Sequence, residues 1–287
     1  MAVHVRVRRA AFIVVFLLLA HGAAAQQQAA ERYTILFSND DGYDAPGLQA
    51  LIQAFQGYGD LYVSAPARNQ SGKGHSITIA DAIVVQRRAT EGVVLGLAIE
   101  ATPATSVRVG LEKFVPRRPH LVISGINRGE NLGTSVYLSG TLGAAREAVF
   151  SGIPAIAVSM AGNSQTDYVA TAAFVRRLVD DLRTRGAIKP GFFLNVNAPA
   201  GVPVGTKVTR LSVLASQQLY DCTPPATDRS ACFSDYEQVK RDEPGTDVAE
   251  FFQGYITLTP MTLDATDAKA MEALRPLENR TPIAVPR

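Results

Sequence analysis

Short apolar runs alternate with amphipathic helical patterns through the first two thirds of the sequence, and this alternation restricts the fold more than any other feature. The runs predict strands from Thr34 up to Asp40 and over residues 61–65, 121–124, 153–159 and 192–196. The patterns between them predict helices over residues 45–55, 141–150 and 167–185. Strands that are separated by helices pair in parallel, and the helices cover both faces of the sheet. We therefore expect an α/β fold.

The first strand ends in two adjacent carboxylates, Asp40 and Asp41, which precede Gly42. Neighbouring carboxylates repel each other, so a fold rarely places them at the end of a buried strand without a cation to hold. An Asp-Gly pair can form a hairpin turn, but the next segment has helical spacing and carries Pro46 near its start. The acids thus lie at the carboxyl end of a strand, where open α/β sheets bind ligands. A solvated acidic turn is the alternative.

Three further segments of small and polar residues follow predicted strands or open a predicted helix. They cover residues 68–76, 124–133 and 139–141. In a parallel sheet, these segments meet Asp40 and Asp41 at one edge. Two carboxylates, a serine hydroxyl and an asparagine carbonyl are hard oxygen donors that suit Mg²⁺ or Mn²⁺. The helix start at Ser139, Gly140 and Thr141 has free backbone N–H groups, which form an anion site.

A metal beside an anion site, without a catalytic cysteine or a GxSxG serine, favours metal-assisted hydrolysis of a phosphate ester. Lys73 or Arg128 would add positive charge to such a site. His75 is a candidate general acid, but a loop histidine with no visible partner is more typical of a structural or solvated residue.

Each piece of this site also has a plainer interpretation. Ser139 is also suited to cap a helix. Asn127 and Asn131 are equally suited to hydrogen-bond the backbone of their own loop. The prediction of a site therefore rests on the combination and not on a single residue.

The first 25 residues have the order of a secretory signal peptide. Basic residues come first, an apolar block covers residues 10–20, and small residues at positions 23–25 precede Gln26. The block is too short to span a bilayer, and an uncleaved anchor is the alternative. We expect cleavage, no membrane anchor afterwards, and a periplasmic or secreted protein.

Removal of this leader changes the charge balance, because residues 1–25 hold three arginines and no acid, which leaves 25 basic against 26 acidic residues. That balance argues against a binder of duplex nucleic acid, which needs a basic surface. Two histidines remain, His75 and His120, so a zinc site built on imidazoles is not expected. In an exported chain, we expect Cys222 and Cys232 to form a disulfide rather than stay free.

The pattern changes after Pro199. Residues 208–213 and 254–259 are strand-like, residues 214–250 are irregular and polar, and residues 278–287 form a loose tail in this interpretation. Within the core, residues 77–85 and 93–99 predict a β-rich insertion. We expect one domain over residues 26–287, with a core over about 32–200 and an extension over about 201–270. The extension has no core of its own, so it packs on the sheet or on another subunit.

Several blocks of this sequence, in order over nearly the whole mature chain, resemble one family. They are Ser38-Asn39-Asp40-Asp41-Gly42 with Ala45-Pro46-Gly47, residues 65–72, Ser124-Gly125-Ile126-Asn127 with Asn131-Leu132-Gly133, Ser139-Gly140-Thr141 with residues 144–147, and residues 194–197, 245–247 and 254–260. The family that they resemble is SurE (survival protein E), a family of metal-dependent 5'/3'-nucleotidases. The chain departs from the family pattern at residues 101–106, which leaves the preferred base or sugar open.

The resemblance implies a Rossmann-like α/β fold, a three-layer sandwich around a mostly parallel sheet. Its β-rich C-terminal extension is used in oligomerisation, as a homodimer or homotetramer. The resemblance also implies one divalent metal ion per subunit, Mg²⁺ or Mn²⁺, held by Asp40, Asp41, Ser71 and Asn127. The substrates that it implies are nucleoside monophosphates, with polyphosphate or other phosphate esters in some members.

We therefore predict an exported, metal-dependent phosphomonoesterase that acts as a 5'-nucleotidase. Asp40 and Asp41 are the predicted catalytic residues. The predicted substrate- or phosphate-binding residues are Asn39, Asn131, Ser139, Gly140 and Thr141. A broad-specificity acid phosphatase or exopolyphosphatase is the alternative enzyme. The alternative of another class is a non-catalytic exported protein that binds nucleotides or phosphate.

Overall fold

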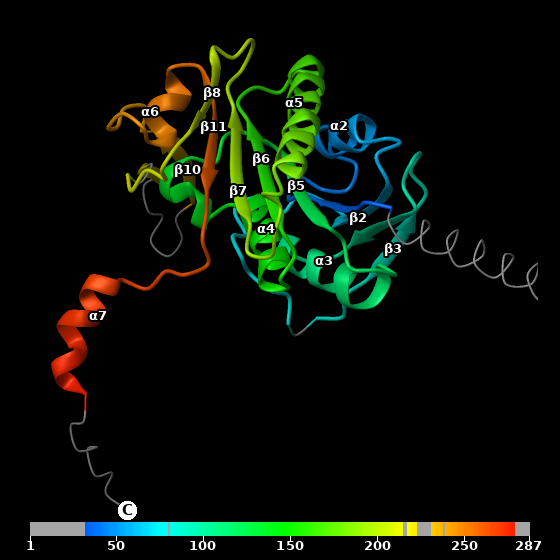
Figure 1. Cartoon of the computed structure of the whole chain (residues 1–287), viewed down its shortest axis with the longest axis horizontal. Helices are drawn as coiled ribbons and strands as arrows, with labels where there is room; N and C mark the ends of the chain where they lie inside the picture. Colours follow the sequence, from blue (N-terminus) through cyan, green and yellow to red (C-terminus); the bar gives the residue numbers. More distant parts are fainter. Residues whose placement is uncertain (1–31, 80, 215–216, 223–230, 238, 279–287) are drawn as a thin grey trace, which may run out of the picture.

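A nine-stranded sheet runs through the described part of the chain, and Figure 1 shows it with helices on both sides. The computed structural model describes residues 32–79, 81–214, 217–222, 231–237 and 239–278. The predicted leader, residues 1–25, and the predicted tail after Glu278 lie outside these ranges.

The order of the strands shows that the sheet is mostly parallel. In space they follow one another as β3 (Val85–Arg88), β4 (Leu95–Ile99), β2 (Asp60–Pro66), β1 (Thr34–Ser38), β5 (Leu121–Arg128), β6 (Ala155–Met160), β7 (Phe193–Ala198), β11 (Tyr255–Pro260) and β8 (Gly205–Val208). All neighbours from β4 to β7 pair in parallel, whereas β3 and β11 run antiparallel to the strands beside them, β4 and β7. The predicted α/β class is confirmed.

Helices cover both faces of this sheet, as its alternating side chains require. Helices α2 (Pro46–Ala54) and α5 (Gln165–Thr184) lie on one face, and α3 (Pro103–Val109) and α4 (Gly140–Phe150) lie on the other. Successive side chains of a strand point to opposite faces. Ile35 and Phe37 of β1 therefore pack towards α2 and α5, whereas Leu36 packs towards α4. Within the described ranges, no helix has both the length and the apolar character needed to cross a bilayer.

The strand order reverses at β1, and this reversal determines where a ligand can bind. From β1 the chain continues to β2 on one side, and it later enters β5 on the other side. Ligands of open α/β sheets bind outside the carboxyl ends of the strands at such a point. The turn that carries Asp40 and Asp41 and the end of β5 with Asn127 thus lie at the same edge.

Residues 77–85 and 93–99, which were expected to form a β-rich insertion, are arranged differently in the structure. Residues 77–79 and 81–84 hold no strand, and β4 pairs in parallel with β2 as part of the main sheet. Ile79, an apolar residue of this segment, is 88% exposed. The Thr78 N–H donates instead to Thr105 Oγ1 of α3 at 2.8 Å. Helix α3, which was not predicted, is only seven residues long and offers too few apolar repeats for a helical period to be recognised.

The C-terminal extension adds strands to the sheet. Strand β11 pairs with β7 and with β8, so the extension packs on the sheet, which is one of the two arrangements that were expected. The strand expected over residues 208–213 is wrong, because β8 ends at Val208. Residues 214–250 were expected to be irregular. Their described part holds the hairpin of β9 (Gln217–Cys222) and β10 (Cys232–Glu237) and helix α6 (Asp247–Phe252).

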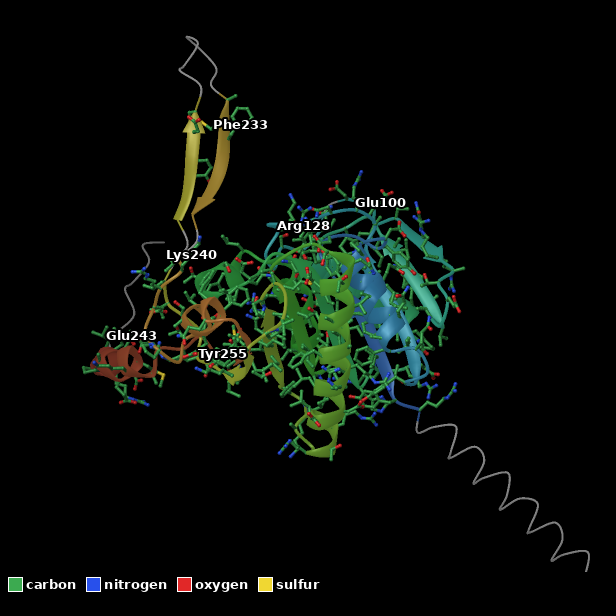
Figure 2. All side chains as sticks on the ribbon, turned by 90° about the horizontal axis from the view of Figure 1, so that it is seen from above. Glu100, Arg128, Phe233, Lys240, Glu243 and Tyr255 are labelled. Carbon is green, nitrogen blue, oxygen red and sulfur yellow. A yellow bond between two sulfur atoms is a disulfide. The ribbon has the colours of Figure 1, made fainter. Side chains whose placement is uncertain are left out.

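The β9–β10 hairpin stands away from the body, and Figure 2 labels Phe233 near its far end. The predicted disulfide between Cys222 and Cys232 is present. Tyr220 and Phe233 are 64% and 68% exposed on the hairpin. Helix α7 (Ala268–Leu274) also lies away from the body and buries no residue (Figure 1). A role of the extension in assembly stays a prediction.

Close packing of α2 on β5 provides a test of the fold. A Cβ atom on Gly47 would lie 2.0 Å from the Ile126 carbonyl oxygen. We expect Gly47→Ala to lower the free energy of unfolding by about 3 kcal/mol or more, since the backbone of α2 and β5 must separate. Gly205→Ala is the matched control, because its Cβ would meet only the Tyr255 ring at an ordinary 3.5 Å. Chemical denaturation measures both, and equal stabilities for the two variants would contradict this packing.

Candidate functional site

A hollow of about 220 Å³ opens at the carboxyl edge of β1 and β5, where the strand order reverses. The residues that line it are Asp40, Ser71, Gly72, Asn127, Arg128, Glu130, Asn131, Ser135, Leu138 and Ser139. Of the residues predicted from the sequence, the structure brings together Asp40, Ser71, Asn127, Asn131 and Ser139 in this lining. Segments that are up to 99 positions apart thus meet at one edge, as the parallel sheet requires.

Asp40 is the most buried acid of this hollow, with an exposed fraction of 2%. Its Oδ1 atom accepts a hydrogen bond from the Thr141 hydroxyl at the start of α4. Gly140 permits this approach, because a Cβ there would lie 2.9 Å from Asp40 Oδ2. Burial raises the pKa of Asp40 from 3.8 to about 6, the bond from Thr141 lowers it, and the charge of Asp41 raises it further. The predicted phosphate-binding residues Gly140 and Thr141 thus directly contact the Asp40 carboxylate.

Asp41 bridges two loops beside the hollow. Its Oδ2 atom accepts from the Arg128 N–H at 3.2 Å, and its Oδ1 atom accepts from Asn69 Nδ2 at 3.4 Å. Burial raises the pKa of Asp41, whereas the backbone N–H and the charge of Arg128 lower it. The second carboxylate therefore links the turn after β1 to the end of β5 and to the loop that carries Ser71.

Asn39 shapes the turn that presents the two acids. Its Nδ2 atom donates to the Gly42 carbonyl at 2.8 Å, and its Oδ1 atom accepts from the Gly42 N–H at 3.2 Å. Gly42 has a φ of +112°, a conformation that side-chain-bearing residues rarely adopt. Asn39 was predicted to contact the substrate or its phosphate. Because it is completely buried, the structure gives it a role in the shape of the turn.

Oxygen atoms of three residues at the hollow are suited to hold a cation. Asn127 directs its Nδ2 atom to the carbonyls of Gly129 and Arg128, at 2.6 and 3.3 Å, which leaves its Oδ1 atom without a hydrogen bond among the described residues. The Ser71 hydroxyl lines the hollow, and the buried Asp40 carboxylate accepts hydrogen bonds from Thr141 but forms no ion pair within the described ranges. Hard, partly anionic oxygen donors of this kind fit Mg²⁺ or Mn²⁺. No cluster of three or more His, Cys, Asp or Glu residues that is suited to a metal occurs within the described ranges.

Asn131 is held from three sides by buried polar side chains of β6 and β7. Its N–H donates to Asn197 Oδ1 at 2.7 Å, and its carbonyl accepts from Asn195 and Asn197 at 2.9 and 3.1 Å. Its Nδ2 atom donates to Ser159 Oγ at 2.8 Å. Ser159, Asn195 and Asn197 were not predicted to have a role, although two amides so close together in a buried strand indicate one.

The C-terminal extension also fixes this loop. The Gly133 N–H donates to Asp247 Oδ2 at 2.9 Å, and Leu132 packs with Val248 and Phe251 of α6. Asp247 is completely buried and its Oδ1 atom accepts from the Ser212 N–H at 2.8 Å. The extension therefore supports the hollow as well as the edge of the sheet.

Ser139 is the N-cap of α4, since its hydroxyl accepts from the Leu142 N–H at 3.3 Å. It is 6% exposed and lines the hollow. The positive end of the dipole of α4 therefore lies at the site and favours negative charge there.

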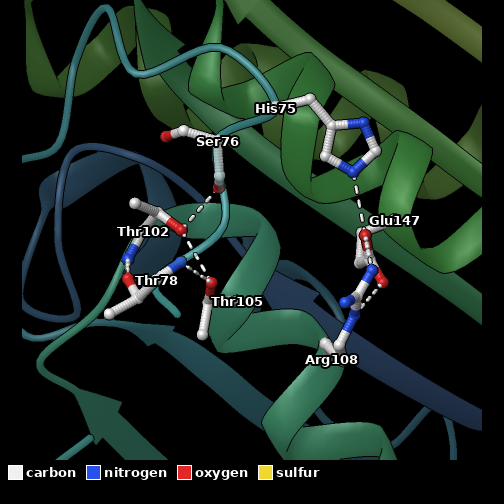
Figure 3. A network of polar contacts seen from close by, with 7 residues as sticks. All are labelled: His75, Ser76, Thr78, Thr102, Thr105, Arg108 and Glu147. Atoms are coloured by element: carbon white, nitrogen blue, oxygen red, sulfur yellow. Dashed lines mark hydrogen bonds and ion pairs between the residues drawn. The ribbon is translucent and has the colours of Figure 1, made fainter. Parts of the chain in front are cut away.

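His75 has a partner that the sequence did not reveal (Figure 3). Its Nε2 atom lies 2.8 Å from Glu147 Oε2, and Arg108 Nε donates to Glu147 Oε1 at 2.7 Å. Burial raises the pKa of Glu147, but the bonds from His75 and Arg108 outweigh it, so this pKa lies below its ordinary value. The His75 ring stacks on Phe150, at the end of α4 that is remote from Ser139. His75 thus ties its loop to α4, and it does not line the hollow.

Comparisons with known proteins agree with this geometry. The sequence matches the family described as "Survival protein SurE" over residues 35–218. The "5'-nucleotidase SurE" of Pelotomaculum thermopropionicum is 40% identical over 246 residues, which cover 85% of this chain and 94% of that protein. The "5'/3'-nucleotidase SurE" of Proteus mirabilis is 37% identical over 254 residues, which cover 87% and 97%.

A solved structure is similar as well. The protein titled "Crystal Structure of Sure Protein from Aquifex aeolicus" is 33% identical, with a TM-score of 0.74. The match covers 86% of this chain and 100% of that chain. Similarity of sequence and of fold therefore extends over most of the chain.

The buried charge of Asp40 gives the metal-free protein a pH dependence. The folded state holds the Asp40 proton up to about pH 6, whereas an unfolded aspartate releases it near pH 3.8. The metal-free fold therefore loses stability as the pH rises from about 4 through 6. Asp40→Asn removes that loss, so at pH 7.5 the metal-free variant should be more stable than the unchanged protein, by up to about 3 kcal/mol.

Urea unfolding at pH 5 and pH 7.5, in the presence of a chelator, measures this difference. We expect the advantage of Asp40→Asn to grow between the two pH values. An equal difference in the free energy of unfolding between the two proteins at both pH values would contradict the burial of a charged Asp40.

Proposed function

The chain belongs to the SurE family, and on that premise we propose that it hydrolyses nucleoside monophosphates to nucleoside and inorganic phosphate, as a 5'-nucleotidase. The relatives at 40% and 37% identity carry the names 5'-nucleotidase and 5'/3'-nucleotidase. The observation that carries the proposal for this chain is the set of carboxylate, hydroxyl and amide oxygen donors around one hollow beside a helix start.

We further propose that Asp40, Asp41, Ser71 and Asn127 hold one divalent cation per subunit, Mg²⁺ or Mn²⁺. A bound cation polarises the phosphoryl group and offsets its negative charge. The two carboxylates supply the negative charge that attracts the cation. The neutral oxygens of Ser71 and Asn127 are further ligands that do not repel a phosphate. In the metal-free protein burial raises the pKa of Asp40 to about 6, and a bound cation would favour the charged form of this carboxyl group.

The substrate phosphate would lie between this cation and the start of α4. The Ser139 cap orients the helix so that its positive end is directed to the hollow. Asn131 lines the hollow in a position that the amides of β7 determine. Ser139, Gly140, Thr141 and Asn131 thus contribute fixed dipoles at the place where charge develops on the phosphoryl group.

Export and assembly are separate proposals. Residues 1–25 have the pattern of a signal peptide, and the disulfide of Cys222 and Cys232 supports an oxidising compartment such as the periplasm or the exterior. The exposed Tyr220 and Phe233 on the projecting hairpin support its use in a homodimer or homotetramer.

Release of inorganic phosphate from a panel of nucleoside monophosphates tests the function. We expect activity with Mn²⁺ or Mg²⁺ and none after chelation. Asp41→Asn and Asn127→Ala should each lower turnover by at least about 10–100-fold. Asp44→Asn is the control, because it removes the same charge from an exposed position that does not line the hollow and forms an ion pair with Arg88 at 3.6 Å.

The panel also separates the alternatives. Preferred release from polyphosphate or simple esters would favour the broad phosphatase or exopolyphosphatase. Binding of nucleotide or phosphate without any release would favour the non-catalytic protein. Full metal-dependent activity in Asp41→Asn would contradict the assignment of the acidic turn.

A further inference from the structure

Arg128 is a cationic residue of the hollow whose side chain has no assigned role. It is the last residue of β5, it lines the hollow and it is exposed. Its backbone is engaged on both sides: the N–H donates to Asp41 at 3.2 Å, and the carbonyl accepts from Asn127 at 3.3 Å. The main chain of Arg128 is thus fixed by two predicted metal ligands, while its guanidinium group forms no hydrogen bond or ion pair with any described residue.

Other arginines of the fold are used differently. Arg108 donates to buried Glu147 at 2.7 Å, and Arg117 donates to buried Asp60 at 2.6 Å. These arginines neutralise acids of the core. Arg128 forms no such ion pair with a buried acid among the residues of the described ranges, so its guanidinium group is available to a ligand of the hollow.

The charges around the hollow indicate what this guanidinium group could bind. Asp40 and Glu130 are the acids of its lining, and Arg128 is the one cationic side chain of that lining. The charge of Arg128 also lowers the pKa of Asp41, so the group lies near the acidic turn. A divalent cation would offset the charge of the two aspartates. A bound phosphate would add further negative charge, and the start of α4 would stabilise that charge from only one side.

We propose that the guanidinium group of Arg128 binds the phosphoryl oxygens of the substrate and stabilises the charge that they carry during transfer. This inference rests on the proposed phosphate-ester hydrolysis. A guanidinium group is planar and presents paired N–H donors that match two oxygens of one phosphate. Phosphoryl transfer depends mainly on such positioned positive charge. Arg128 is thereby a catalytic residue that sequence reasoning offered only as additional charge.

The positive charge of Arg128 should have opposite effects on the binding of metal and on the binding of phosphate. A cationic side chain beside Asp41 repels a metal ion, so its removal should leave metal affinity unchanged or raise it. Its removal should weaken phosphate binding at the same time. The affinities for metal and for phosphate, measured together, therefore distinguish an arginine that binds phosphate from one that supports the metal ligands.

The test compares Arg128→Ala, Arg128→Lys and the control Arg87→Ala. Arg87 is an exposed arginine of β3, the edge strand that β4 and β2 separate from β1, and its side chain has no hydrogen bond or ion pair within the described ranges. Four quantities are measured for each protein: kcat/KM for a nucleoside monophosphate, kcat/KM for ribose 5-phosphate, the Kd of Mn²⁺, and the Kd of inorganic phosphate for the Mn²⁺-loaded protein.

We expect Arg128→Ala to lower kcat/KM at least about tenfold for both esters and to raise the Kd of phosphate. Arg128→Lys should recover part of the loss, because it keeps the charge but not the paired donors. The Kd of Mn²⁺ should stay the same or fall, and Arg87→Ala should change nothing.

Three results would overturn the proposal. Unchanged activity in Arg128→Ala would show that Arg128 has no role in the reaction. A loss of kcat/KM for the nucleotide alone would indicate that Arg128 contacts the base and not the phosphate. A parallel loss of Mn²⁺ affinity would assign it to the support of the metal site. If the unchanged protein hydrolyses neither ester, the proposed function fails, and the Kd of phosphate still decides whether Arg128 binds the anion.

Discussion

The burial of the Asp40 carboxylate is the constraint on which the site depends. It lies 2% exposed against the first turn of α4, where Gly140 permits the approach and Thr141 donates a hydrogen bond. A charge in such surroundings is unfavourable unless it is paired, and the pKa of about 6 shows that the hydrogen bond offsets only part of this effect. The divalent cation proposed here would complete the compensation, so the burial that destabilises the metal-free protein would favour a bound metal ion.

The loops around this carboxylate are held by polar contacts from several parts of the fold. Asn39 fixes the turn after β1 through both atoms of its amide. Asn195 and Asn197 hold the loop after β5 from inside the sheet, and Asp247 holds it from the extension. Because these groups are buried and hydrogen-bonded, they fix positions that apolar contacts alone would leave variable. The extension is therefore part of the site's support and not only an addition to the edge of the sheet.

Sequence reasoning found the features that repeat and missed those that depend on distant partners. Helical periods predicted α4 and α5, and short apolar runs predicted the central strands. The polar segments after these strands were expected to meet at one edge, and the family resemblance implied Asp40, Ser71 and Asn127 within them. The seven residues of α3 carried no recognisable period. The bond between His75 and Glu147 joins positions that are 72 residues apart, which no local pattern reveals. Asn39 was predicted to contact the substrate or its phosphate, and in the structure its buried amide hydrogen-bonds the backbone of its own turn.

The most direct test of this account is the position of a bound metal ion. A crystal structure with Mn²⁺, read from the anomalous scattering of the metal, locates it without reference to activity. The account predicts one anomalous peak in the hollow, within about 2.5 Å of Asp40 Oδ2 and Asn127 Oδ1, the range of metal–oxygen bonds. A hollow without metal at saturating Mn²⁺, or a single peak elsewhere on the protein, would contradict it.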